Sequence, residues 1–68
     1  MQAVETSARP EFWMDVYNGR PIAILQHHGR WHVYLDHIFQ HNVVFATAEH
    51  AIVWLTERVD QGVPGRLN

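Results

Sequence analysis

The sequence contains no cysteine and no lysine, and its 68 residues include only five basic side chains besides histidine, all of them arginine. Without cysteine, disulfides and thiolate metal sites are excluded, and nothing points to an oxidising compartment. No apolar run approaches the roughly 20 residues that a transmembrane helix needs. The N-terminal stretch MQAVETSARP lacks the basic start and apolar core of a signal peptide. We therefore expect a soluble, cytoplasmic protein with no membrane partner.

The length of the chain predicts one small domain. A chain of about 60 residues buries only about 60% of its unfolded surface, so its stability margin is narrow. Chains of this size usually gain stability from disulfides, a metal or a partner subunit. From composition and patterning we expect a flexible N-terminal arm over residues 1–10, a single domain over 11–62 and a C-terminal tail over 63–68.

Two turn signals divide the first half of the chain. The pair Asn18–Gly19 is typical of a two-residue hairpin turn, because both positions of that turn need a positive φ. It predicts strands over residues 11–17 and 20–27, which are apolar at nearly every position. A second turn at His28–Gly29 predicts a third strand over residues 30–36.

The two turns also set the pairing of these strands. Counting from each turn, Met14 faces Ala23 and Ile24 faces Val33. Because side chains alternate across a strand, this register divides the apolar residues between the two faces of the sheet. One face collects the large apolar side chains Trp13, Ile22, Ile24, Trp31, Val33 and Leu35.

The second half of the chain predicts a helix. Thr47 is a favourable N-cap, and Gly62 is a favourable C-terminal residue. Residues 37–42 fit either a fourth strand reached through a turn or a loop before a last strand over 43–46. The fold class is therefore α+β: a three- or four-stranded antiparallel meander sheet packed on one C-terminal helix, a ββ(β)βα two-layer sandwich. The apolar stripe that faces the sheet comprises Ala48, Ala51, Ile52, Leu55 and Val59.

The opposite face of the predicted sheet is apolar as well. One helix covers only one face, and an exposed apolar patch usually marks an interaction site. We therefore expect a non-enzymatic protein-binding module that forms a homodimer or binds another protein. The alternative is that the arm, residues 37–42 or the tail folds over this face. The candidate interface residues are Phe12, Met14, Val16, Leu25, His27, His32 and Tyr34.

The order of elements over residues 12–60 resembles that of DNA-binding domains built from a three-stranded sheet and a helix, such as the arm-binding domain of phage-type integrases and the plant AP2 domain. The resemblance implies a nucleic-acid-binding regulator as an alternative function. Those domains bind DNA through a sheet face rich in arginine and lysine. Here only Arg20 and Arg30 lie near the turns, and the formal net charge is −2, so nucleic acid is the less favoured partner.

Histidine is abundant, with six residues. His27 and His32 are predicted diagonal neighbours on one face, and with His28 or His41 they suggest a third hypothesis, a zinc or nickel site. No HExxH motif accompanies them, so we assign no metal ligand and expect no cofactor. No glycine-rich phosphate loop and no nucleophile–base pair stands out, so we assign no catalytic residue.

Overall fold

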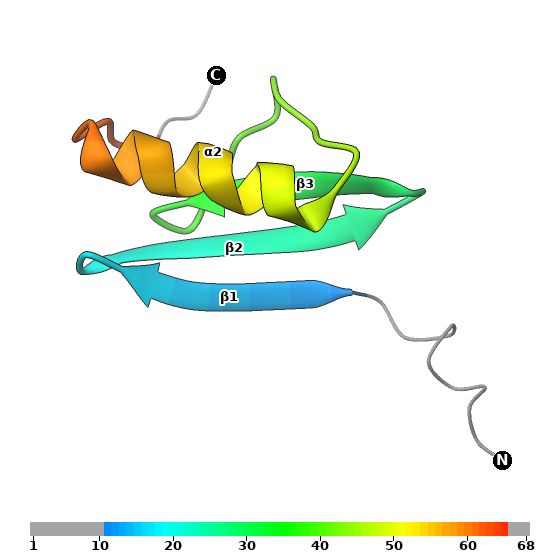
Figure 1. Ribbon diagram of the computed structural model, residues 1–68, viewed down its shortest axis with the longest axis horizontal. Coiled ribbons are helices and arrows are strands. Elements are labelled where there is room, and N and C mark those ends of the chain that lie inside the picture. The colour runs from blue at the N-terminus through cyan, green and yellow to red at the C-terminus, as the bar shows by residue number, and fades with distance from the viewer. Residues whose placement is uncertain (1–10, 66–68) are drawn as a thin grey trace, which may run out of the picture.

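The computed structural model describes residues 11–65 and contains a four-stranded antiparallel sheet with one helix against one face (Figure 1). The strands follow one another in the order β1-β2-β3-β4, which is the predicted meander. The predicted α+β fold class is thus confirmed. The predicted arm over residues 1–10 lies outside the described residues. The elements are β1 (Phe12–Tyr17), β2 (Arg20–His27), β3 (Arg30–Leu35), β4 (Ile38–Phe39) and α2 (Ala48–Asp60).

Three two-residue turns connect the four strands. The predicted turns at Asn18–Gly19 and His28–Gly29 both have positive φ at their two central residues. A third turn of the same kind joins β3 to β4, with φ of 56° at Asp36 and 67° at His37. Turns with positive φ at both central residues match the right-handed twist of the strands that they join. This repeated geometry produces a meander with very short connections.

The predicted register is confirmed along the whole β1–β2 hairpin. Met14 lies opposite Ala23, and across the next strand pair Ile24 lies opposite Val33. The strand limits differ slightly from the prediction. β1 begins at residue 12 rather than 11, and β3 ends at Leu35 because Asp36 already belongs to the third turn.

The prediction of a strand over residues 43–46 is wrong. The tight third turn places β4, only two residues long, beside the end of β3. The chain then returns toward the start of β3 and touches it at a single bridge. There the Trp31 N–H donates to the Phe45 carbonyl at 2.7 Å, and the Phe45 N–H donates to the Trp31 carbonyl at 2.9 Å. The helix begins at Ala48, which leaves no length for a longer strand.

The hydrophobic core lies between α2 and the two central strands. The Thr47 hydroxyl accepts a hydrogen bond from the His50 N–H at 3.2 Å, as expected of an N-cap. The predicted helix stripe faces the sheet, with Ala48 and Ile52 at its partly buried margin. The buried core residues are Ile22, Ile24, Val33, Leu35, Ala51, Leu55 and Val59.

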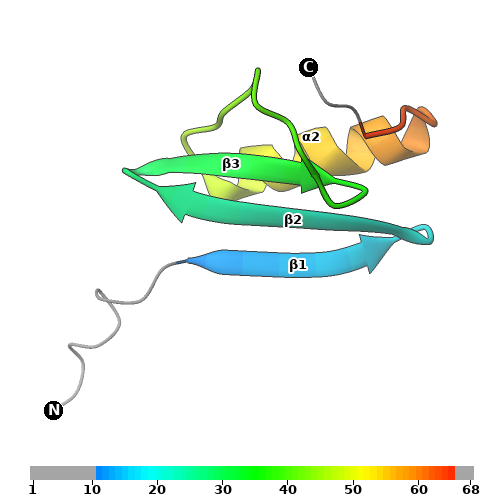
Figure 2. The ribbon, with the colours of Figure 1, turned by 180° about the vertical axis from the view of Figure 1, so that it is seen from behind.

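The helix covers β2 and β3 but not β1. Most of its contacts with the sheet are with these two strands, and most of β1 lies clear of it in both ribbon views (Figures 1 and 2). The end of the first hairpin reaches α2, where the Tyr17 hydroxyl donates to the Asp60 carboxylate at 3.1 Å. Trp13 lies on the same face as Ile24, as predicted, but because α2 does not extend over β1 its side chain is 38% exposed.

Candidate functional site

The sheet face turned away from α2, called the open face here, has no described element lying over it (Figure 2). The strand register determines which side chains point to this face, because side chains alternate along each strand. All of the predicted interface residues share it. They are Phe12, Met14 and Val16 on β1, Leu25 and His27 on β2, and His32 and Tyr34 on β3.

Apolar exposure on the open face is concentrated on β1. Val16 is 64% exposed, Phe12 56% and Met14 55%. Leu25 and Tyr34, which lie nearer the middle of the sheet, are half-buried. A central strand is flanked by neighbours on both sides, whereas β1 is a border strand with one neighbour. The exposed apolar surface therefore lies at one side of the open face.

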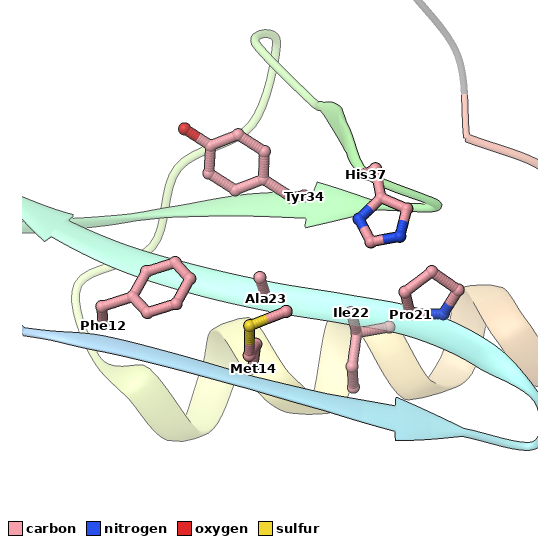
Figure 3. Close-up of a pocket in the computed structure, with 7 residues that line it drawn as sticks. All are labelled: Phe12, Met14, Pro21, Ile22, Ala23, Tyr34 and His37. Atoms are coloured by element: carbon pink, nitrogen blue, oxygen red, sulfur yellow. The ribbon is translucent and has the colours of Figure 1, made fainter.

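A shallow hollow of about 200 Å³ lies between β1 and the third turn (Figure 3). Phe12 and Met14 line it from β1, Ala23 lies at its floor, and Tyr34 and His37 border it on the far side. Small-molecule pockets usually measure about 300–1,000 Å³. This hollow therefore suits an apolar side chain of a partner better than a substrate or cofactor.

Phe39 extends the open face on β4, and the sequence analysis did not identify it. Its side chain is 37% exposed. Its ring lies 5.3 Å from that of Tyr34 and 5.9 Å from that of His32, measured between centroids. It was missed because the assignment of residues 37–42 was ambiguous. Recognising Asp36–His37 as a turn would have placed Phe39 opposite Tyr34.

A second hollow, of about 510 Å³, lies at the other end of the open face and is rich in histidine. Arg30 and four histidines line it, namely His27, His28, His32 and His41, and no carboxylate side chain does. The predicted proximity of His27 and His32 is confirmed, with their ring centroids 6.2 Å apart. Across residues 11–65, however, no three histidine or carboxylate side chains come together in a way that would hold a metal ion. The metal hypothesis therefore has no assembled site in this range.

An ion pair on the helix side of the sheet ties the C-terminal segment to the domain. Arg20 donates to both carboxylate oxygens of Asp36, at 3.1 Å from Nε and 2.6 Å from Nη2. Arg20 Nη2 also donates to the Val63 carbonyl, and the Gly65 N–H donates to Asp36 Oδ2 at 2.9 Å. The Arg20 and Gly65 hydrogen bonds hold the pKa of Asp36 below its ordinary value.

This ion pair accounts for two residues considered in the sequence analysis. Arg20 lies opposite Tyr17, which contacts α2, so Arg20 points to the helix side and not to the open face. It is therefore engaged structurally and is not placed to bind nucleic acid through the open face. The described residues of the predicted tail, 63–65, bond to this ion pair rather than folding over the open face.

Comparison of the chain with models of protein families, with curated proteins and with solved structures finds no match. No helix within residues 11–65 has the length and apolar content needed to cross a bilayer.

Proposed function

We propose that this protein is a small, non-enzymatic protein-binding module that acts through its open face, and that its partner is a second copy of the chain. The supporting observation is the exposure of Phe12, Met14 and Val16, each more than half exposed on one strand. Burying one apolar side chain of this size in a contact with a partner favours association by about 1.5–3 kcal/mol. The proposal includes a cytoplasmic location, in keeping with a sequence that has no cysteine.

A protein partner fits the apolar part of the open face, around β1, better than a small ligand does. The hollow beside Met14 has room for a side chain but is smaller than usual ligand pockets. The residues that line the two hollows of the open face include no serine, threonine, aspartate or glutamate. A second copy supplies matching apolar side chains, and association adds buried surface to a domain whose own core is small.

Sedimentation over a range of concentrations, with circular dichroism to monitor folding, tests the proposal. We expect the wild-type chain to self-associate and the variant Met14→Glu with Leu25→Glu to remain monomeric. A matched control, His50→Glu with Val53→Glu, places two carboxylates on exposed positions of α2 and should associate like the wild type. If the double variant unfolds, Met14→Glu alone serves, since that side chain is 55% exposed. Undiminished association of a folded Met14→Glu variant would contradict the proposal.

Nucleic acid is a second candidate partner, favoured by the histidine-rich hollow. Arg30 and four histidines line the hollow without any carboxylate, beside the exposed ring of Phe39. An aromatic ring next to basic groups suits a single-stranded nucleic acid, whose bases stack and whose phosphates are neutralised. Titration with a single-stranded oligonucleotide at low and high salt separates the two candidates. Binding to phosphates weakens steeply with salt, whereas apolar self-association does not.

A further inference from the structure

Within residues 11–65, the outer edge of β1 is unpaired, and it is longer and more apolar than the edge at the other border of the sheet. β1 is a border strand of six residues, and only Asp15 among them is charged. The other border strand, β4, has two residues. In residues 11–65 nothing lies alongside the outer edge of β1 (Figures 1 and 2). Proteins usually shorten, cover or charge such edges, because unpaired backbone groups readily pair with another strand.

The hairpin geometry determines which backbone groups occupy this edge. In a two-residue turn the flanking residues, here Tyr17 and Arg20, form a hydrogen-bonded pair, and bonded pairs then recur at every second residue. The same alternation continues beyond the strand, where the Gln26 N–H donates to the Glu11 carbonyl at 2.8 Å. The odd-numbered residues of β1 therefore bond to β2. The even-numbered residues direct their N–H and C=O groups outward.

These even-numbered residues are Phe12, Met14 and Val16, whose side chains are also the most exposed apolar ones on the open face. The outward backbone groups and the exposed side chains thus belong to the same three residues. One of the outward groups is already engaged, since the Val16 N–H donates to Asp15 Oδ1 at 2.7 Å. A strand that paired with this edge would satisfy the backbone groups and place its own side chains directly beside these apolar ones.

We infer that β1 pairs antiparallel with β1 of a second copy, with Met14 opposite Met14 of the partner subunit. This inference rests on the proposed function and specifies how the two copies meet. In this register Phe12 lies opposite Val16 of the partner subunit, so all three outward-facing residues are paired in both chains. The two four-stranded sheets join into one continuous sheet of eight strands. Their open faces become one surface, with the exposed apolar side chains meeting across the joint.

The charge on β1 selects this register among the symmetric alternatives. Centring the pair on Met14 places Asp15 opposite Trp13 of the partner subunit. A shift centred on Asp15 would place it opposite Asp15 of the partner subunit, and like charges directly opposite each other destabilise a strand pair. A shift centred on Trp13 would leave Val16 without a partner on β1. Only the Met14 register pairs all three outward residues and separates the two carboxylates.

Asp15 also weakens the association in this arrangement. Its carboxylate holds the Val16 N–H, which would bond to the carbonyl of Phe12 of the partner subunit after pairing. Self-association must therefore break a hydrogen bond to a charged group. We expect Asp15→Ala to strengthen dimer formation.

Proline at residue 14 tests the edge directly. Proline has no N–H, and border strands tolerate it where the N–H faces away from the sheet. Met14→Pro should therefore keep the monomer fold while removing both central hydrogen bonds of the dimer. Met14→Leu keeps the N–H and a side chain of similar size, and is the matched control. By sedimentation we expect dimer formation to weaken about tenfold or more in the proline variant only.

Amide hydrogen exchange in the wild-type chain provides a second measurement that does not depend on the proline variant folding. The amides of Phe12 and Met14 should become protected as the protein concentration rises. A folded Met14→Pro variant that dimerises like the wild type would overturn the edge pairing, as would unprotected amides in a wild-type dimer. Either result leaves association through the open face standing. A wild-type chain that stays monomeric at every concentration would contradict the proposed function itself.

Discussion

Replacing Leu55 by alanine tests the packing between helix and sheet on which the open face depends. The Leu55 side chain is fully buried, at 0% exposure, in the middle of the helix stripe. It packs in one cluster with Ile24 and Val33, which are 1% and 0% exposed. Deleting a buried leucine side chain costs about 2–5 kcal/mol, depending on how far the surroundings can collapse. Strands held in two-residue hairpins have little freedom to move inward, so we expect the upper half of this range.

The expected loss is large relative to the stability of the domain. Small domains have a free energy of unfolding of roughly 0.05–0.15 kcal/mol per residue, which gives about 3–10 kcal/mol for a chain of 68 residues. Urea denaturation followed by circular dichroism at a fixed protein concentration measures the change. Val53→Ala on the same helix is the control. Val53 is 52% exposed, and we expect this substitution to change the free energy of unfolding by no more than about 0.5 kcal/mol. If Leu55→Ala lowered the free energy of unfolding by less than about 1 kcal/mol, the assignment of the helix stripe would be refuted.

Two further predictions concern the turns and the ion pair. Gly19→Val should lower the free energy of unfolding by about 1–3 kcal/mol, because a β-branched residue is strained at a φ of 78°; unchanged urea stability would count against the first turn. Asp36 has a pKa below its ordinary value of 3.8, so its ionisation stabilises the folded chain above that pH, and this contribution disappears as pH falls through the lowered pKa. Asp36→Asn should therefore have a lower free energy of unfolding than wild type at pH 7, and the difference should shrink as the pH falls below 3.8. A difference independent of pH would show that the charge of Asp36 is unimportant.

The parts of the fold that could be predicted from the sequence are those determined by local chemistry. Asn18–Gly19 set the register of the first hairpin, because few residue pairs adopt two positive φ values without strain. Thr47 and the apolar spacing that follows it determined the helix and its buried side. Together they were enough to identify the open face and its apolar residues on β1.

The parts that could not be predicted depend on geometry between distant segments. The Asp36–His37 turn contains no glycine, so its positive φ values had only a weak sequence signal, and a fourth strand containing Phe39 remained one of two alternatives. The spacing of apolar residues showed which side of the helix is buried but not which strands lie beneath it. Trp13 was therefore grouped with the apolar residues that face the helix, whereas the helix covers the two central strands and leaves Trp13 38% exposed. The bonds of the C-terminal segment to Arg20 had no local pattern either.

The central claim is that a second copy of the chain binds where β1 exposes its apolar side chains and its free edge. Sedimentation of the full-length wild-type chain across a wide concentration range tests it most directly. We predict a concentration-dependent change from the mass of one chain to that of two, which Met14→Glu with Leu25→Glu abolishes. A wild-type chain that sediments with the mass of one chain at every concentration would contradict the claim.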